Sequence, residues 1–85
     1  MTVRVQLFAA ARDLAGAASL EVDLPDGPDV SVNVAALRAA LLRSAPRLER
    51  LASTLLIAVN SEYATDATKI VEGAEIAAFP PVSGG

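Results

Sequence analysis

The C-terminal segment, Phe79-Pro80-Pro81-Val82-Ser83-Gly84-Gly85, contains the residues whose types and spacing could take part in chemistry. Two consecutive prolines favour an extended backbone, and the two glycines after them allow close approach to another protein. At roughly 3.3 Å per residue, the six residues from Pro80 could project up to about 20 Å from a folded domain. The reactive group at the end of such a tail is the α-carboxylate of Gly85. We therefore predict a tail, residues 80–85, that presents this carboxylate.

A carboxylate is inert until it is activated. Reaction of Gly85 with ATP would give an acyl-adenylate, and a sulfur donor could convert that to a thiocarboxylate. For this chemistry the domain only has to present the tail, so it needs no Cys or His side chain, and this 85-residue chain contains neither. The missing residue types exclude a disulfide framework, a thiolate zinc site, a cysteine nucleophile and histidine acid/base chemistry. We expect no metal site and no bound cofactor, with ATP used by an activating partner.

The charge and hydropathy of the chain limit the classes of partner that it is expected to bind. Seven basic residues against ten acidic ones give a net charge of -3, which argues against binding to the phosphates of nucleic acid. Hydrophobic residues make up 53% of the chain, yet no apolar run reaches the roughly 18 residues of a membrane span. The N-terminus enters an alternating pattern at once and resembles no signal peptide. These features predict a cytoplasmic globular domain that binds neither nucleic acid nor membrane.

The charged residues fall into two groups. One group is basic and lies in the helical middle of the chain: Arg38, Arg43, Arg47 and Arg50. The other is acidic, accompanied by Lys69, and lies nearer the C-terminus: Glu62, Asp66, Glu72 and Glu75. Both groups fit a solvated surface. Alternatively, the acidic side steers the C-terminus towards a basic pocket of a partner.

Hydrophobic periodicity gives the order of the elements. Alternation over 3–7 and 20–24 predicts two strands that pair as an antiparallel hairpin. A short helix over 8–15, which ends at Gly16, connects them. The main amphipathic helix is expected over 32–43 with Ser31 as N-cap, and Pro46 interrupts it before a short helix over 47–53. Its apolar face comprises Val34, Leu37, Leu41, Ala45 and Leu48. Later strands are expected at 55–59, buried on both faces or nearly so, at an edge from Tyr63, and at 75–79 after a turn at Gly73.

This order predicts an α+β fold of the β-grasp (ubiquitin-like) type. We expect a mixed sheet of about five strands with one main helix and short extra helices, and with the first and last strands adjacent in the centre. The domain would span residues 1–79, followed by the tail.

Aromatic residues are scarce, and two of them are candidate interface residues. One pair of the last strand, either Ile76 and Ala78 or Ala77 and Phe79, must face away from the main helix. A ring placed outside leaves apolar surface for a partner to cover. For Phe79 the core and the interface remain equally open, whereas for Tyr63, which follows a turn, the interface is favoured.

The whole chain resembles a known family. The segment Phe79–Gly85 is similar to the C-terminal signature of the small, sulfur-carrier subunits of molybdopterin synthase, which are ubiquitin-like proteins. The segments Leu7–Gly16, Ala58-Val59-Asn60 and Val71–Ile76 look like that family's first strand and helix, its third-strand end and its last turn. Two departures are Ala74, where an acidic residue is common, and Ala78, where a bulky residue is common. The latter predicts a less bulky docking surface.

The resemblance implies a function. Gly85 would be the thiocarboxylated residue, and Pro80, Pro81, Val82, Ser83 and Gly84 would thread into two partners in turn. These partners would be an adenylating enzyme of the ubiquitin-activating type and the large synthase subunit, which would hold the pterin precursor and carry the catalytic residues. The family's hydrophobic contact surface would map onto Phe79 and Tyr63, and two small and two large subunits would form a heterotetramer. The chain would not be an enzyme by itself.

Other functions share the tail. The alternatives are a sulfur carrier for thiamine or cysteine biosynthesis, a ubiquitin-like protein modifier whose Gly85 forms isopeptide bonds with lysines, and an interaction module with an incidental tail. The Phe-Pro-Pro-Val sequence favours the molybdenum-cofactor carrier.

Overall fold

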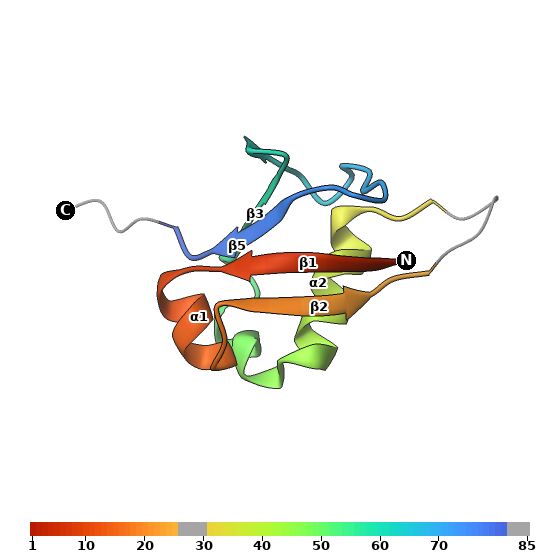
Figure 1. Cartoon of the computed structure of the whole chain (residues 1–85). Coiled ribbons are helices and arrows are strands. Elements are labelled where there is room, and N and C mark those ends of the chain that lie inside the picture. Colours follow the sequence, from red (N-terminus) through yellow and green to blue (C-terminus); the bar gives the residue numbers. More distant parts are fainter. Residues whose placement is uncertain (26–30, 82–85) are drawn as a thin grey trace.

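The structure, a computed structural model, describes residues 1–25 and 31–81. Its sheet contains five strands in the order β2-β1-β5-β3-β4. The strands are β1 (Thr2–Leu7), β2 (Ser19–Asp23), β3 (Leu56–Val59), β4 (Glu62–Tyr63) and β5 (Ile76–Phe79). The helices are α1 (Ala9–Ala15), α2 (Val34–Ser44) and the 3₁₀ helix η1 (Pro46–Leu51). Figure 1 shows the main helix, α2, behind the sheet, with α1 and η1 below one end of it.

The central strands are parallel, and the outer pairs are antiparallel. β1 pairs with β5 in parallel, whereas β2 pairs with β1, and β3 with both β5 and β4, in antiparallel fashion. The predicted β-grasp fold, with its first and last strands adjacent, is confirmed. So is the predicted hairpin of β1 and β2 around a short helix, which ends at Gly16 with φ 74. A left-handed residue at this position is tolerated best by glycine.

The core lies between α2 and the inner face of the sheet. Alternate residues of β1 point inwards, since its burial alternates strictly between exposed and buried. All five residues predicted for the apolar face of the main helix are buried: Val34, Leu37, Leu41, Ala45 and Leu48. They meet the inward side chains of the strands: Val3, Val5, Leu7, Val22, Ile57, Ile76 and Ala78. At roughly 25 cal/mol per Å² of buried apolar area, this contact is the main stabilising term of a domain without disulfides.

Two boundary predictions for the main helix are wrong. The N-cap is Asn33, not Ser31, and its Oδ1 accepts a hydrogen bond from the Ala36 N–H at 3.0 Å. Residues 32 and 33 are extended because they pair with another segment: the Ile70 N–H donates to the Val32 carbonyl, and Asn33 forms a bridge with Lys69. These long-range backbone bonds delay the start of the helix by two residues.

The prediction that 55–59 is buried on both faces is also wrong. Ile57 is buried within β3, but Leu56, Ala58 and Val59 are only half-buried. The reason is that, among the described residues, α2 and its neighbours cover one face of the sheet and no element covers the other. The predicted short helix after Pro46 exists, but as a 3₁₀ helix over Pro46–Leu51.

Candidate functional site

The site begins where the last strand leaves the sheet. Because β1 and β5 are parallel, both strands end at the same side, and the Phe8 N–H donates to the Ala78 carbonyl at 3.2 Å. The final pair of the β3–β5 ladder is Leu56 with Phe79. Pro80 and Pro81 follow, and a proline has no N–H with which to extend the ladder. The chain therefore leaves the centre of the sheet, not an edge, at Pro80 (Figure 1).

Pro80 is half-buried and Pro81 is exposed. The remaining residues to which the sequence assigned the tail chemistry, Val82, Ser83, Gly84 and Gly85, lie outside the described residues.

The two aromatic candidates lie together on the outer face of the sheet. Ile76 and Ala78 face the core at 2% and 0% exposure, so Ala77 and Phe79 face outwards. This outcome resolves the alternative left open for the last strand. Tyr63 is 77% exposed, and its ring centroid lies 5.8 Å from that of Phe79, with the ring planes tilted by 55°. Tilted rings at this distance attract one another through their quadrupoles.

A third aromatic residue belongs to the same surface and was missed from the sequence. Phe8 is 47% exposed and lies at the junction of β1 and α1. The next residue, Ala9, has φ 52, a left-handed conformation that is unfavourable for alanine. The available signal was the alternation in β1: Val3, Val5 and Leu7 point inwards, so Phe8 continues the outward series. We name the outer surface formed by the exposed Phe8 and Tyr63 and the half-buried Leu56 and Phe79 the aromatic face.

Ala78 does not take part in this face. The sequence suggested that a small residue there makes the docking surface less bulky, but Ala78 is fully buried between Leu7 of β1 and Ile57 of β3. Its size affects packing of the core. The outward neighbour, Ala77, is the residue whose small side chain shapes the outer surface.

The basic and acidic groups of residues noted in the sequence are connected by an ion pair between Arg38 and Asp66. Arg38 Nε donates to Asp66 Oδ1 at 2.8 Å, and its Nη1 donates to the Leu55 carbonyl at 2.6 Å. Arg38 thus joins α2 to the loop after β4 and to the segment before β3. The other three arginines of the predicted basic group, Arg43, Arg47 and Arg50, are exposed, as are Glu62, Glu72 and Glu75.

Within residues 1–25 and 31–81, no group of three or more His, Cys, Asp or Glu side chains could hold a metal ion. Across the same residues, no helix combines the length and the apolar character needed to cross a membrane.

Known proteins resemble this chain over its whole length. The molybdopterin synthase sulfur carrier subunit of Arabidopsis thaliana is 37% identical, covering 98% of this chain and 82% of the relative. That of Caenorhabditis elegans is 31% identical, covering 100% of this chain and 99% of the relative. The crystal structure of SAMP1, small archaeal modifier protein 1, from Haloferax volcanii superimposes with a TM-score of 0.84 at 31% identity, covering 100% of both chains. Residues 5–85 match the ThiS family, and the chain therefore belongs to the ThiS family.

Proposed function

We propose that this chain is the sulfur-carrier subunit of a molybdopterin synthase. The observation that carries the proposal is the exit of the chain at Phe79-Pro80-Pro81 beside the paired rings of Tyr63 and Phe79. An exposed apolar surface next to the point where the chain leaves the sheet suits a protein that docks on a partner and inserts its C-terminus. The relatives named as sulfur carrier subunits of this synthase support the same assignment.

The chemistry proceeds at Gly85 in three steps. The carboxylate attacks the α-phosphorus of ATP, giving the acyl-adenylate and pyrophosphate. A sulfide equivalent then attacks the acyl carbon, so that a carbon–sulfur bond forms and AMP leaves. Finally the thiocarboxylate sulfur attacks a carbon of the pterin precursor and displaces an oxygen leaving group, and water then cleaves the acyl–sulfur bond, which returns the carboxylate and leaves the sulfur on the product as a thiolate. The chain supplies a co-substrate and no catalytic side chain.

Two protein partners follow from these steps. The first is an adenylating enzyme of the ubiquitin-activating type, which binds ATP and holds Gly85 during activation. The second is the large synthase subunit, which holds the pterin precursor and carries the catalytic residues, in a heterotetramer of two small and two large subunits. The aromatic face is the docking surface, and the acidic residues Glu62 and Glu75, at the other end of β5, favour approach to a basic surface of a partner.

Mass spectrometry of the intact chain tests the proposal. After incubation with the activating enzyme, ATP and a sulfide source, we expect the mass increase of one sulfur replacing one oxygen, located at Gly85. Two variants serve as controls: deletion of Gly85, and addition of one residue after it. Both should abolish the mass change, because each removes the carboxylate from its required position. Full activity of the Gly85 deletion in a reconstituted synthase would overturn the proposal.

A protein modifier is the second candidate. It is favoured by the structural similarity to SAMP1, whose name describes a modifier protein. In that function a lysine amine attacks the acyl carbon of the adenylate, so that an isopeptide bond forms and AMP leaves. The same experiment, carried out in a cell extract, separates the two functions: lysine-linked adducts of the intact chain indicate the modifier, and the thiocarboxylate indicates the carrier.

A further inference from the structure

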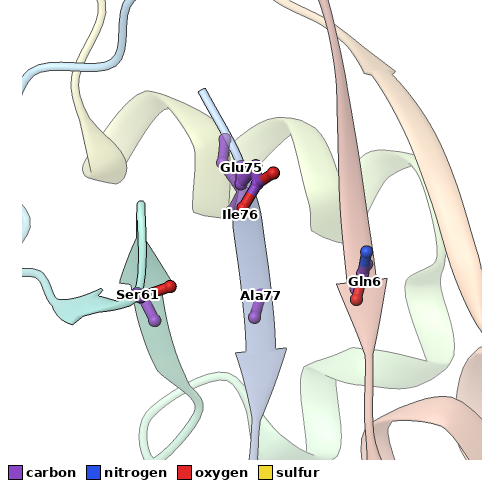
Figure 2. A pocket seen from close by; sticks show the side chains of 6 residues that line it. Gln6, Ser61, Glu75, Ile76 and Ala77 are labelled. Carbon is purple, nitrogen blue, oxygen red and sulfur yellow. The ribbon is translucent and has the colours of Figure 1, made fainter. Parts of the chain in front are cut away.

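A small hollow lies on the outer face of the sheet. Its volume is about 140 Å³, and it is lined by residues from three strands and the turns beside them: Gln6, Ala58, Ser61, Glu75, Ile76 and Ala77. Figure 2 shows Ser61 and Gln6 on either side of Ala77, Glu75 at the start of β5, and the main helix behind the sheet. The hollow therefore opens on the side away from the core.

The strand register explains the hollow. Ala77 pairs with Gln6 on β1 and with Ala58 on β3, and Ala58 pairs in turn with Tyr63. Residues paired in this way lie side by side on one face of a sheet. The methyl groups of Ala77 and Ala58 thus lie in the middle of a row of four side chains. The longer side chains of Gln6 and Tyr63 lie at its two ends. The small residues form a low apolar floor between taller walls.

The walls carry hydrogen-bond acceptors that have no partner within the described part of the chain. These are the amide oxygen of Gln6, the hydroxyl of Ser61 and the carboxylate of Glu75, none of which makes a side-chain hydrogen bond or ion pair there. The backbone beneath Glu75 is fixed, since its N–H donates to Asn60 Oδ1 at 2.9 Å and its carbonyl accepts from the Asn60 N–H at 2.7 Å. The backbone that carries Glu75 is therefore held in place, and the three side-chain acceptors are not used internally.

The charge around the hollow is negative. No Lys or Arg lines it, and Glu62 follows Ser61 directly. Arg4 lies two residues before Gln6 on the same face of β1, but it is paired with Glu21 at 3.4 Å. A ligand that suits this hollow has an aliphatic stem for the alanine floor and a positively charged group with several N–H donors.

We propose that the hollow receives a basic side chain, an arginine or a lysine, of the large synthase subunit. Its stem would lie over Ala58 and Ala77, and its N–H groups would donate to Gln6, Ser61 and Glu75. Arginine and lysine offer five and three donors, which matches a site of several acceptors. Ala58, on the floor of the hollow, pairs with Tyr63, so the hollow adjoins the aromatic face. This inference rests on the proposed function, because it takes that subunit as the partner on the sheet.

Isothermal titration of the full chain with the purified large subunit tests the proposal. Glu75→Gln removes the negative charge from the hollow, and Glu49→Gln in η1 makes the same change in net charge far from it. Because a charge-assisted hydrogen bond in a buried interface is lost, we expect Glu75→Gln to raise Kd by about tenfold or more and Glu49→Gln by less than about twofold. Salt should weaken the binding of the wild-type chain more than that of Glu75→Gln.

A second pair of variants tests the shape of the hollow. Ala77→Leu fills the hollow from its floor, and Ala35→Leu adds the same side chain to the exposed surface of α2. We expect Ala77→Leu alone to raise Kd by about tenfold or more. Wild-type affinity for both Glu75→Gln and Ala77→Leu would overturn this inference while leaving the proposed function intact. Failure of the wild-type chain to bind the large subunit at all would overturn both.

Discussion

The rings of Tyr63 and Phe79 lie 5.8 Å apart, centroid to centroid, although the two residues are on strands that are not neighbours. β3 separates β4 from β5: Tyr63 pairs with Ala58 of β3, whose side chain is only a methyl group, and Phe79 pairs with Leu56, two residues earlier on β3. The rings therefore meet over β3 at the point where the chain passes into Pro80. The exposed apolar surface and the chain exit are one structural unit, which is why we assign docking to this face.

Replacing Tyr63 by alanine should separate docking from folding. The side chain is 77% exposed on a two-residue edge strand, so its loss should change the free energy of unfolding by about 1 kcal/mol or less. A central aromatic residue of an interface is a typical hot spot, and we expect the Kd for the large subunit to rise by about tenfold or more. Urea denaturation and isothermal titration measure the two effects.

Val71→Ala is the matched control for Tyr63→Ala. Val71 is also an exposed apolar residue, at 63%, but it precedes the turn before β5 and is not part of the aromatic face. Its loss should leave both the stability and the affinity nearly unchanged. If Val71→Ala weakened binding as much as Tyr63→Ala, the docking surface would lie elsewhere.

Asn33→Ala should destabilise the protein, whereas Ser31→Ala should not. The Asn33 side chain accepts the hydrogen bond of the Ala36 N–H at 3.0 Å and so caps α2, and the loss of such a cap costs about 1 kcal/mol. Ser31 is exposed and caps nothing, and we expect its replacement to cost less than about 0.5 kcal/mol. Equal midpoints in urea for the two variants would contradict the observed start of the helix.

Much of the fold could be predicted from local sequence patterns. The alternation Val3-Val5-Leu7 places β1 on the core, and Gly16 ends α1 where a left-handed residue is needed. The start of α2 could not be predicted in this way. Ser31 and Asn33 are both good N-caps, and the choice depends on pairing of Val32 with Ile70, 38 positions along the chain, which no local pattern reveals.

The site shows the same division between local and long-range information. The tail segment stays a prediction from residue types, and strand alternation places Phe79 on the same face as Ala77 but leaves open which face is buried. The meeting of Tyr63 with Phe79, the inclusion of Phe8 and the hollow above Ala77 depend on which strands are neighbours and in which register. The role given to Ala78 was wrong for this reason: alternation leaves two faces, and only the packing of α2 shows which face is buried.

The strained backbone at Ala9 provides a stability test near the site. Ala9 has φ 52, where glycine has no steric penalty, so Ala9→Gly should stabilise the protein by up to about 1 kcal/mol. The same substitution one residue later, Ala10→Gly, lies within α1 and should destabilise it by about 0.5–1 kcal/mol. Thermal unfolding of both variants checks the opposite signs. Destabilisation by Ala9→Gly would contradict the left-handed conformation.

Arg38 should contribute more to stability than an exposed arginine does. Its side chain is 25% exposed and bonds both Asp66 and the Leu55 carbonyl, whereas the Arg4–Glu21 pair is 67% and 66% exposed. We expect Arg38→Met, which keeps most of the aliphatic stem, to cost about 1–3 kcal/mol, because the Leu55 carbonyl loses a charged donor. Exposed ion pairs contribute about 1 kcal/mol or less.

Two further substitutions show how much of the stability lost in Arg38→Met comes from its ion pair with Asp66. One removes that pair, and the other removes an exposed pair for comparison. Asp66→Asn removes the ion pair but leaves the bond to Leu55, so it should cost less than Arg38→Met. Glu21→Gln breaks the exposed pair with Arg4 and should cost about 0.5 kcal/mol or less. Urea denaturation at low and high salt gives the order, and salt should reduce the effect of Glu21→Gln more than that of Arg38→Met. If Asp66→Asn and Arg38→Met were equally destabilising, the ion pair, and not the bond to the backbone, would hold α2 to β3.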